Sequence, residues 1–300
     1  MVQAMPRFMD PDFQKSDAFL SASDEQRSFV QRLAQDGVAT VQLQVADFDR
    51  VAHEIVSQTT ALLPGNGRLQ DAWRRIPEVR AIATNAHVMH LLEFAYGKRA
   101  VPFQTLNFTV GTQQATHSDT IHFDSFPKNF MCGVWVAYED TDAENGALHY
   151  VPGSHRLRAM APEDFGVRGS TYRNRTEVYK QYEVALAKYI EDSRMERVAI
   201  PLKKGQALVW TANLFHGGEP IRDKSRTRHS QVTHYYFEDC LYFSPLWSNL
   251  HAGQMTYKKV FDISSDKYVV PVYNGAKFRL PLSAHLREFV LAQVIGVRKS

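Results

Sequence analysis

Two His-x-Asp triplets stand close together in the stretch "THSDTIHFDS". The first contains His117 and Asp119, and the second contains His122 and Asp124. In a β-strand, residues two positions apart point to the same face, so either triplet could direct an imidazole and a carboxylate at one metal ion. Spacing alone does not choose between them, and a single His-x-Asp is a weak motif because it also arises by chance.

A third candidate ligand and a candidate carboxylate-binding pair follow downstream. The stretch "QALVWTANLFHGGEP" predicts a strand that runs into His216, and the two glycines after it would allow close approach to a metal-bound molecule. The stretch "SRTRHSQVTHYYF" predicts another strand, on which Arg228 and Ser230 share one face. A guanidinium group binds a carboxylate through two parallel hydrogen bonds, and a serine hydroxyl can add a third.

Two histidines and one carboxylate form the facial triad that binds Fe(II) in non-haem oxygenases, and this ligand set leaves metal positions open for a co-substrate and O₂. With a carboxylate anchor nearby, the pattern indicates an oxygenase that uses Fe(II), 2-oxoglutarate and O₂. A non-catalytic metal-binding jelly-roll protein and a zinc-dependent hydrolase could use the same ligands. The pair Arg228 and Ser230 favours the oxygenase, because a hydrolase needs no carboxylate clamp beside its third ligand.

Several segments together resemble the phytanoyl-CoA dioxygenase family: "THSD", "GVWVAYED", "ENGALHYVPGSHR", "LFHGG" and "TRHS". The most distinctive of them runs from Asn145 to His155, and the resemblance covers about residues 100–240. It implies a double-stranded β-helix, or jelly-roll, fold with Fe(II) and 2-oxoglutarate. It also implies oxidation of a C–H bond of a small to medium-sized metabolite, usually by hydroxylation.

The resemblance also implies a role for individual residues. It favours His117 and Asp119, with His216, as metal ligands, because the family places its triplet directly after a segment such as "GTQQAT". The residues left for the substrate side are His122, Asp124 and His234. The residues implied in 2-oxoglutarate binding are Arg228, Ser230, Trp135, Gln104 and Asn107. His155 is expected to be structural. Because both triplets keep an aspartate, we expect hydroxylation or a related oxidation rather than halogenation.

Composition narrows the class of protein further. The 300 residues carry a formal charge of +3, from 35 basic and 32 acidic side chains, which gives no electrostatic reason to expect nucleic acid or a membrane surface as a partner. The N-terminal stretch has no apolar signal-peptide region, and two cysteines are too few for a disulfide framework. We therefore expect a soluble cytoplasmic enzyme whose partner is a small-molecule substrate.

The secondary structure predicted for the chain changes from mainly helical to mainly β near residue 99. Residues 20–98 predict helices with one strand, "VATVQL", whereas about 99–240 hold short runs rich in valine, threonine and aromatic residues, which are typical of a jelly-roll. A helical insertion at about 160–195 is basic, and it could be a solvated surface or a lid. A last helix is predicted from "SAHLREFVLAQVIG". No linker is evident, so we expect one mainly β domain with flanking helices over residues 1–300.

Overall fold

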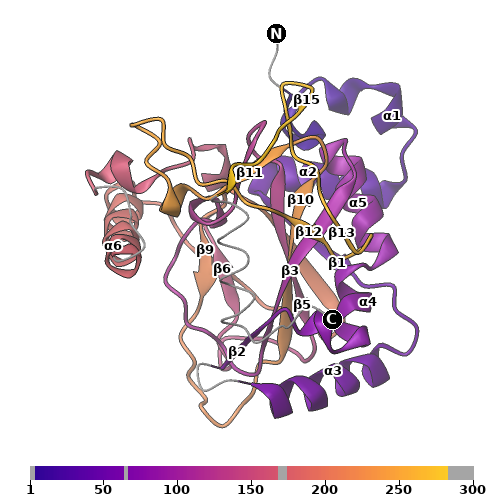
Figure 1. Ribbon diagram of the computed structural model, residues 1–300. Coiled ribbons are helices and arrows are strands. Elements are labelled where there is room, and N and C mark those ends of the chain that lie inside the picture. Colours follow the sequence, from indigo (N-terminus) through magenta and orange to yellow (C-terminus); the bar gives the residue numbers. More distant parts are fainter. Residues whose placement is uncertain (1–3, 64–66, 168–173, 283–300) are drawn as a thin grey trace.

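The computed structural model describes residues 4–63, 67–167 and 174–282 (Figure 1). The last helix predicted from the sequence lies outside these residues. The α-helices are α1 (Asp17–Leu20), α2 (Asp24–Asp36), α3 (Phe48–Leu62), α4 (Pro77–Ala83), α5 (Ala86–Tyr96) and α6 (Arg175–Asp192). The strands are β1 (Val38–Gln42), β2 (Arg68–Gln70), β3 (Ala100–Phe108), β4 (Asp124–Phe126), β5 (Met131–Ala137), β6 (Leu148–Tyr150), β7 (Val198–Ile200), β8 (Gln206–Thr211), β9 (His216–Gly218), β10 (Ser230–Phe237), β11 (Leu241–Phe243), β12 (Phe261–Asp262), β13 (Lys267–Tyr268), β14 (Val272–Tyr273) and β15 (Ala276–Lys277).

Six strands form the larger sheet, in the order β1-β8-β5-β10-β3-β2, and each neighbouring pair is antiparallel. Every residue of β5 and β10 is buried. Because these central strands are covered on both faces, large apolar side chains occupy odd and even positions alike, and the usual alternation of polar and apolar residues is lost.

A smaller sheet, β7-β6-β9, faces the larger one, and a bridge between His117 and His216 extends it by one more segment. Apolar side chains from both sheets fill the space between them, namely Leu106, Phe108, Trp135, Leu208, Trp210 and Val232 against Leu148, Tyr150 and Ile200. Two facing antiparallel sheets around one core make a jelly-roll, so the predicted fold class is confirmed.

Helices α2 to α5 cover the outer face of the larger sheet (Figure 1). Helix α2 begins with the predicted capping box, in which Ser23 and Gln26 each accept a hydrogen bond from the other's backbone N–H, and ends at Gly37 with a φ of 79°. His155 packs beside Gly37 and donates a hydrogen bond to the carbonyl of Ala34, which agrees with the structural role expected for it.

The boundary expected near residue 99 needs correction. Strands β1 and β2 come from the mainly helical N-terminal part, yet they form the two edges of the larger sheet. The jelly-roll therefore does not fold from residues 99–240 alone, because hydrogen bonding to β8 and β3 recruits two earlier segments.

Helix α6 lies within the predicted insertion and packs outside the smaller sheet (Figure 1). It buries Val178, Tyr182, Leu186 and Ile190 against a cluster that includes Ile121 and Phe215. Ile121 follows Asp119 closely and Phe215 directly precedes His216, so the helix covers the segments that carry the candidate ligands. None of the helices in the described part of the chain combines the length and apolar character that a membrane span requires.

Candidate metal centre

Three buried side chains converge at one end of the barrel. The potential donor atoms of His117, Asp119 and His216 all lie within 4.8 Å of one another. The Nε2 atom of His117 is 3.8 Å from Oδ1 of Asp119, and Nε2 of His216 is 3.9 Å from Oδ2. Two imidazole nitrogens and a carboxylate at these separations fit the three protein ligands of a facial triad around Fe(II).

Backbone carbonyls fix the orientation of both imidazoles. Nδ1 of His117 donates to the carbonyl of Ala115 over 2.9 Å, and Nδ1 of His216 donates to the carbonyl of Leu214 over 3.0 Å. Because a neutral imidazole has only one N–H, both Nε2 atoms keep a lone pair, and that of His117 accepts a hydrogen bond of 3.2 Å from the side-chain amide of Gln114. Burial and the neighbouring His216 lower the pKa of His117 to about 4, although Asp119 opposes them, so this ligand is neutral at physiological pH.

Asp119 is held by a residue that no motif in the sequence marks as part of the site. The indole Nε1 of Trp210, on β8, donates a hydrogen bond of 2.8 Å to Oδ2 of Asp119. Burial alone raises the pKa of Asp119, but His216, His234 and the other neighbouring donors outweigh burial and lower the pKa to about 2. The carboxylate is therefore ionised and ready to bind a cation.

A glycine on the adjacent strand makes room for that indole. Gly133 of β5 lies opposite Trp210 of β8, and a Cβ added at Gly133 would stand 2.3 Å from the Trp210 ring. Any side chain there would displace the donor that supports Asp119. Gly217 meets a similar restriction beside His216, because an added Cβ would lie 2.8 Å from both the carbonyl of Gln114 and Nε2 of His149.

A fourth imidazole stands next to the triad. Nε2 of His234 lies 3.7 Å from Oδ2 of Asp119, and Nδ1 lies 3.1 Å from Oε1 of Gln104. The two residues face each other across β10 and β3, on the same face as the inner apolar core. His234, which is predicted on the substrate side, thus stands beside the candidate ligand Asp119, and Gln104 contacts His234, while the predicted part of Gln104 in 2-oxoglutarate binding stays a prediction.

The predicted carboxylate anchor lies in the interior of the barrel. Arg228 and Ser230 are each 1% exposed, and the Arg228 guanidinium lies 5.4 Å from the centre of the Trp135 ring. Within the described residues, Nε of Arg228 and Oγ of Ser230 find no hydrogen-bond partner. Buried polar atoms are normally satisfied, so an orphaned guanidinium nitrogen beside an orphaned hydroxyl fits a ligand carboxylate. The residues present therefore suit 2-oxoglutarate.

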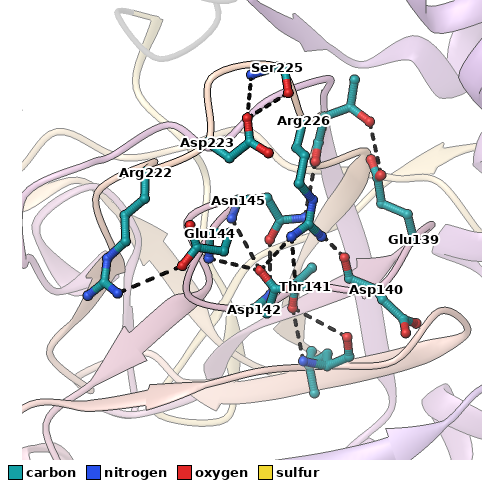
Figure 2. Close-up of polar contacts among 12 residues, drawn as sticks. Glu139, Asp140, Thr141, Asp142, Glu144, Asn145, Arg222, Asp223, Ser225 and Arg226 are labelled. Carbon is teal, nitrogen blue, oxygen red and sulfur yellow. Dashed lines mark hydrogen bonds and ion pairs between the residues drawn. The ribbon is translucent and has the colours of Figure 1, made fainter.

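Figure 2 shows polar contacts between two loops, residues 139–145 and 222–226, of which the second leads to Arg228. The Arg226 guanidinium donates to both carboxylate oxygens of Asp142 over 2.9 Å, and the Asn145 amide donates to the carbonyl of Thr227 over 3.1 Å. Gly146 directly follows Asn145, and its carbonyl accepts a hydrogen bond from Arg228 itself. The Asn-Gly element that stood out in the sequence thus positions the anchor.

Two predicted residues do not reach the site. Asn107 donates to Oε1 of Gln231 over 3.3 Å, and Gln231 in turn donates to the carbonyl of Val79 in α4. Asn107 therefore points to the helical layer, and its predicted part in 2-oxoglutarate binding is corrected. Asp124 forms an ion pair with Lys128 and accepts from the backbone of Ser125 over 2.8 Å, so its carboxylate is already engaged.

His122 lies within electrostatic range of the candidate ligands His117 and Asp119. Its half-buried ring lies 4.9 Å from the ring of Tyr179 on α6. Burial, and to a smaller extent His117, lowers the pKa of His122 to about 3. A neutral imidazole beneath α6 is a reasonable contact for a bound molecule, and this role of His122 stays a prediction.

A family model and curated relatives match this chain. The family model "Phytanoyl-CoA dioxygenase (PhyH)" matches residues 12–230. The "Phytanoyl-CoA dioxygenase domain-containing protein 1 homolog" of Dictyostelium discoideum is 23% identical over 193 residues, which are 56% of this chain and 64% of the relative. The chain thus spans just under two thirds of that relative's length.

Solved structures with the same fold include two iron enzymes. The non-heme alpha ketoglutarate dependent epimerase SnoN from nogalamycin biosynthesis is 19% identical, with 85% of this chain and 96% of SnoN covered at a TM-score of 0.58. SnoN has also been solved with Fe3+, alpha ketoglutarate and nogalamycin RO. EctD from S. alaskensis with bound Fe is 18% identical, with 72% and 76% covered at a TM-score of 0.51. At these identities the likeness shows the fold alone.

Proposed function

The chain belongs to the phytanoyl-CoA dioxygenase family, and we propose that it is a non-haem Fe(II)- and 2-oxoglutarate-dependent dioxygenase. It hydroxylates or otherwise oxidises a C–H bond of a small to medium-sized metabolite and releases succinate and CO₂. One observation carries the proposal: a buried His-Asp-His group shares the barrel with a buried arginine and serine, of which Nε of Arg228 and Oγ of Ser230 find no hydrogen-bond partner among the described residues.

Each residue has a physical task in this proposal. His117, Asp119 and His216 would hold Fe(II) and leave one side of the ion open. Arg228 and Ser230 would bind the far carboxylate of 2-oxoglutarate and give it one orientation. When bound together, Fe(II), 2-oxoglutarate and O₂ supply an oxidant strong enough to attack an unactivated C–H bond.

The substrate would lie on the side of the metal centre that His122 and His234 border. The aromatic side chains of Phe123 and Phe103 pack beside His234, with ring centres 5.0 and 6.1 Å from its own, and they would exclude water from the reacting atoms. Hydroxylation is the simplest outcome. The epimerase among the solved structures is a reminder that this fold also hosts other reactions.

A direct test uses purified protein with Fe(II), 2-oxoglutarate and O₂, without added substrate. We expect slow formation of succinate, which His216→Ala abolishes. His53→Ala is the matched control, because this histidine is exposed on α3, and it should behave like the wild type. Tight zinc binding without succinate under any condition would instead favour a zinc-dependent hydrolase or a non-catalytic metal-binding protein.

The choice between the two triplets has its own measurement. Asp119→Ala should lose iron, whereas Asp124→Ala should retain it, because Asp124 is engaged with Lys128 away from the triad. Iron content after anaerobic loading and gel filtration compares the two variants. Loss of iron from Asp124→Ala alone would overturn the assignment.

A further inference from the structure

Lys258 brings a positive charge to the substrate side of the metal centre. The segment around it returns to the barrel next to β11: Tyr257 bridges to Phe243, and the backbone N–H of Lys258 donates to the carbonyl of Tyr242 over 2.8 Å. The ammonium nitrogen lies 4.5 Å from the centre of the Phe123 ring, in the middle of the second His-x-Asp triplet. A segment far along the chain thus places a lysine beside His122.

The neighbours of Lys258 do not neutralise it. The positive charge of Lys258 lowers the pKa of both His122 and His234. Among the described residues, no carboxylate forms an ion pair with its ammonium group. Burial lowers the pKa of Lys258 to about 8, so most of this lysine is charged at physiological pH.

A second cation lies within electrostatic range of the same histidines. The positive charge of Arg68, on β2, also lowers the pKa of His122 and of His234. Asp119 and Tyr179 lie within electrostatic range of Arg68 and oppose the effect of burial, which lowers its pKa. Two cations therefore lie near two histidines that are both neutral. A half-buried ammonium group with an aromatic ring on one side and no anionic partner is costly unless a ligand supplies the anion.

We propose that Lys258 binds an anionic group of the substrate, a carboxylate or a phosphate, beside the metal centre. The inference rests on the proposed function, because it names the class of molecule that this oxygenase would oxidise. An anchored anion would fix which C–H bond of the substrate faces the metal.

The lysine does not bind the co-substrate, 2-oxoglutarate, in this proposal. The proposed anchor of 2-oxoglutarate, Arg228 with Ser230, lies at the start of β10, whereas His234 beside Lys258 lies in the middle of that strand. Four residues of extended chain, at about 3.3 Å each, place Ser230 and His234 roughly 13 Å apart. Lys258 and Arg228 would therefore bind different carboxylates.

The test compares an anion with its neutral counterpart. Anaerobic protein is loaded with Fe(II) and saturated with 2-oxoglutarate, so that Arg228 is occupied. Calorimetry then measures binding of 3-phenylpropanoate, phenyl phosphate and the neutral 3-phenylpropanamide. We expect the wild type to bind an anionic probe about 10- to 100-fold more tightly than the amide, as a charge-assisted hydrogen bond would give. The better of the two anions identifies the group.

The variants locate the effect. Lys258→Gln should lose the preference for the anion, and Lys258→Arg should keep it. Lys259→Gln is the matched control, because the neighbouring ammonium group lies 3.6 Å from the Tyr268 ring instead of at the metal centre, and it should bind like the wild type. A wild type without preference, or Lys258→Gln that retains it, would overturn the proposal. So would a Lys258→Gln variant that weakens 2-oxoglutarate binding and leaves the preference unchanged.

The pH dependence gives a second readout. As pH rises through about 8, Lys258 loses its proton and the anion preference should fall, whereas Lys258→Arg should hold it. The other titratable groups around His122 and His234 do not change charge in this range: Arg68 stays protonated, burial raises the pKa of Tyr179 above its usual value, and the pKa values of His122 and His234 are about 3 and about 4. A preference that persists unchanged at pH 10 would contradict the role of Lys258.

Failure of this inference is distinguishable from failure of the proposed function. Succinate formation tests the oxygenase and needs no substrate. The anion preference can also be measured on metal-free protein, because Lys258 is not a candidate metal ligand. Succinate without anion preference refutes the inference alone, whereas an anion preference without succinate refutes the oxygenase alone.

Discussion

The hydrogen bond from Trp210 to Asp119 makes a sharp prediction about metal affinity. Trp210→Phe keeps a ring between the sheets but removes the indole N–H that lies 2.8 Å from Oδ2 of Asp119. Both side chains are 4% exposed, so water cannot easily replace the lost donor. A hydrogen bond to a charged group contributes about 1.5–3 kcal/mol.

That energy should appear as weaker Fe(II) binding. Since a tenfold change in affinity corresponds to about 1.4 kcal/mol, the loss predicts an iron affinity reduced about 10- to 100-fold. Partners that orient metal ligands typically have effects of this size. Loss of charge does not explain such a change: the pKa of Asp119 is about 2, and a rise of about two units would still leave it ionised at pH 7.

Anaerobic titration with Fe(II) measures the affinity, and thermal unfolding of metal-free protein shows whether the variant folds. Trp73→Phe is the matched control, because the Trp73 indole also donates to an aspartate, Asp71, over 3.3 Å but belongs to the helical layer. A folded Trp210→Phe with wild-type affinity would refute the argument. An equal loss in Trp73→Phe would show that the effect is general destabilisation.

Three further predictions follow from the site. Asn145→Ala removes the amide that holds the loop before Arg228, so the Kd for 2-oxoglutarate should rise about tenfold in calorimetry, as loss of a hydrogen bond worth about 1.4 kcal/mol would give. Gly133→Ala forces a Cβ into the Trp210 ring and should lower the free energy of unfolding by about 1–3 kcal/mol in denaturant titrations, with weaker iron binding. The free energy of unfolding of the metal-free protein should fall as pH falls from about 6.5 to about 4, because His117 binds a proton in the unfolded chain but stays neutral in the folded one. Urea titrations across this pH range should show a loss of up to about 3 kcal/mol from this residue.

The sequence was most informative where one strand carries the whole signal. Arg228 and Ser230 share a face because they are two residues apart, and the structure keeps them together beside Trp135. The same rule could have prevented an error. Gln104 and Asn107 are three residues apart on β3, so they point to opposite faces, and only Gln104 reaches the site.

The sequence was least informative where two strands must be set in register. Trp210 supports Asp119 only because β8 lies beside β5 with Gly133 opposite the indole, and no local pattern encodes that alignment. The same holds for Lys258. Its segment has no strong periodicity, and its place depends on a single bridge to β11.

Backbone conformation, which a short motif does not specify, separates the two His-x-Asp triplets. Ser118 is extended, with φ −118° and ψ 137°, so His117 and Asp119 project to the same side as they would in a strand. The chain then turns, and His122 adopts helical angles of φ −99° and ψ −34°. The second triplet is therefore not one extended segment: its histidine packs beside Tyr179 of α6, while Asp124 joins β4 and pairs with Lys128. Identical spacing thus yields a pair of converging ligands in one case and two separated side chains in the other, which is why iron should follow Asp119.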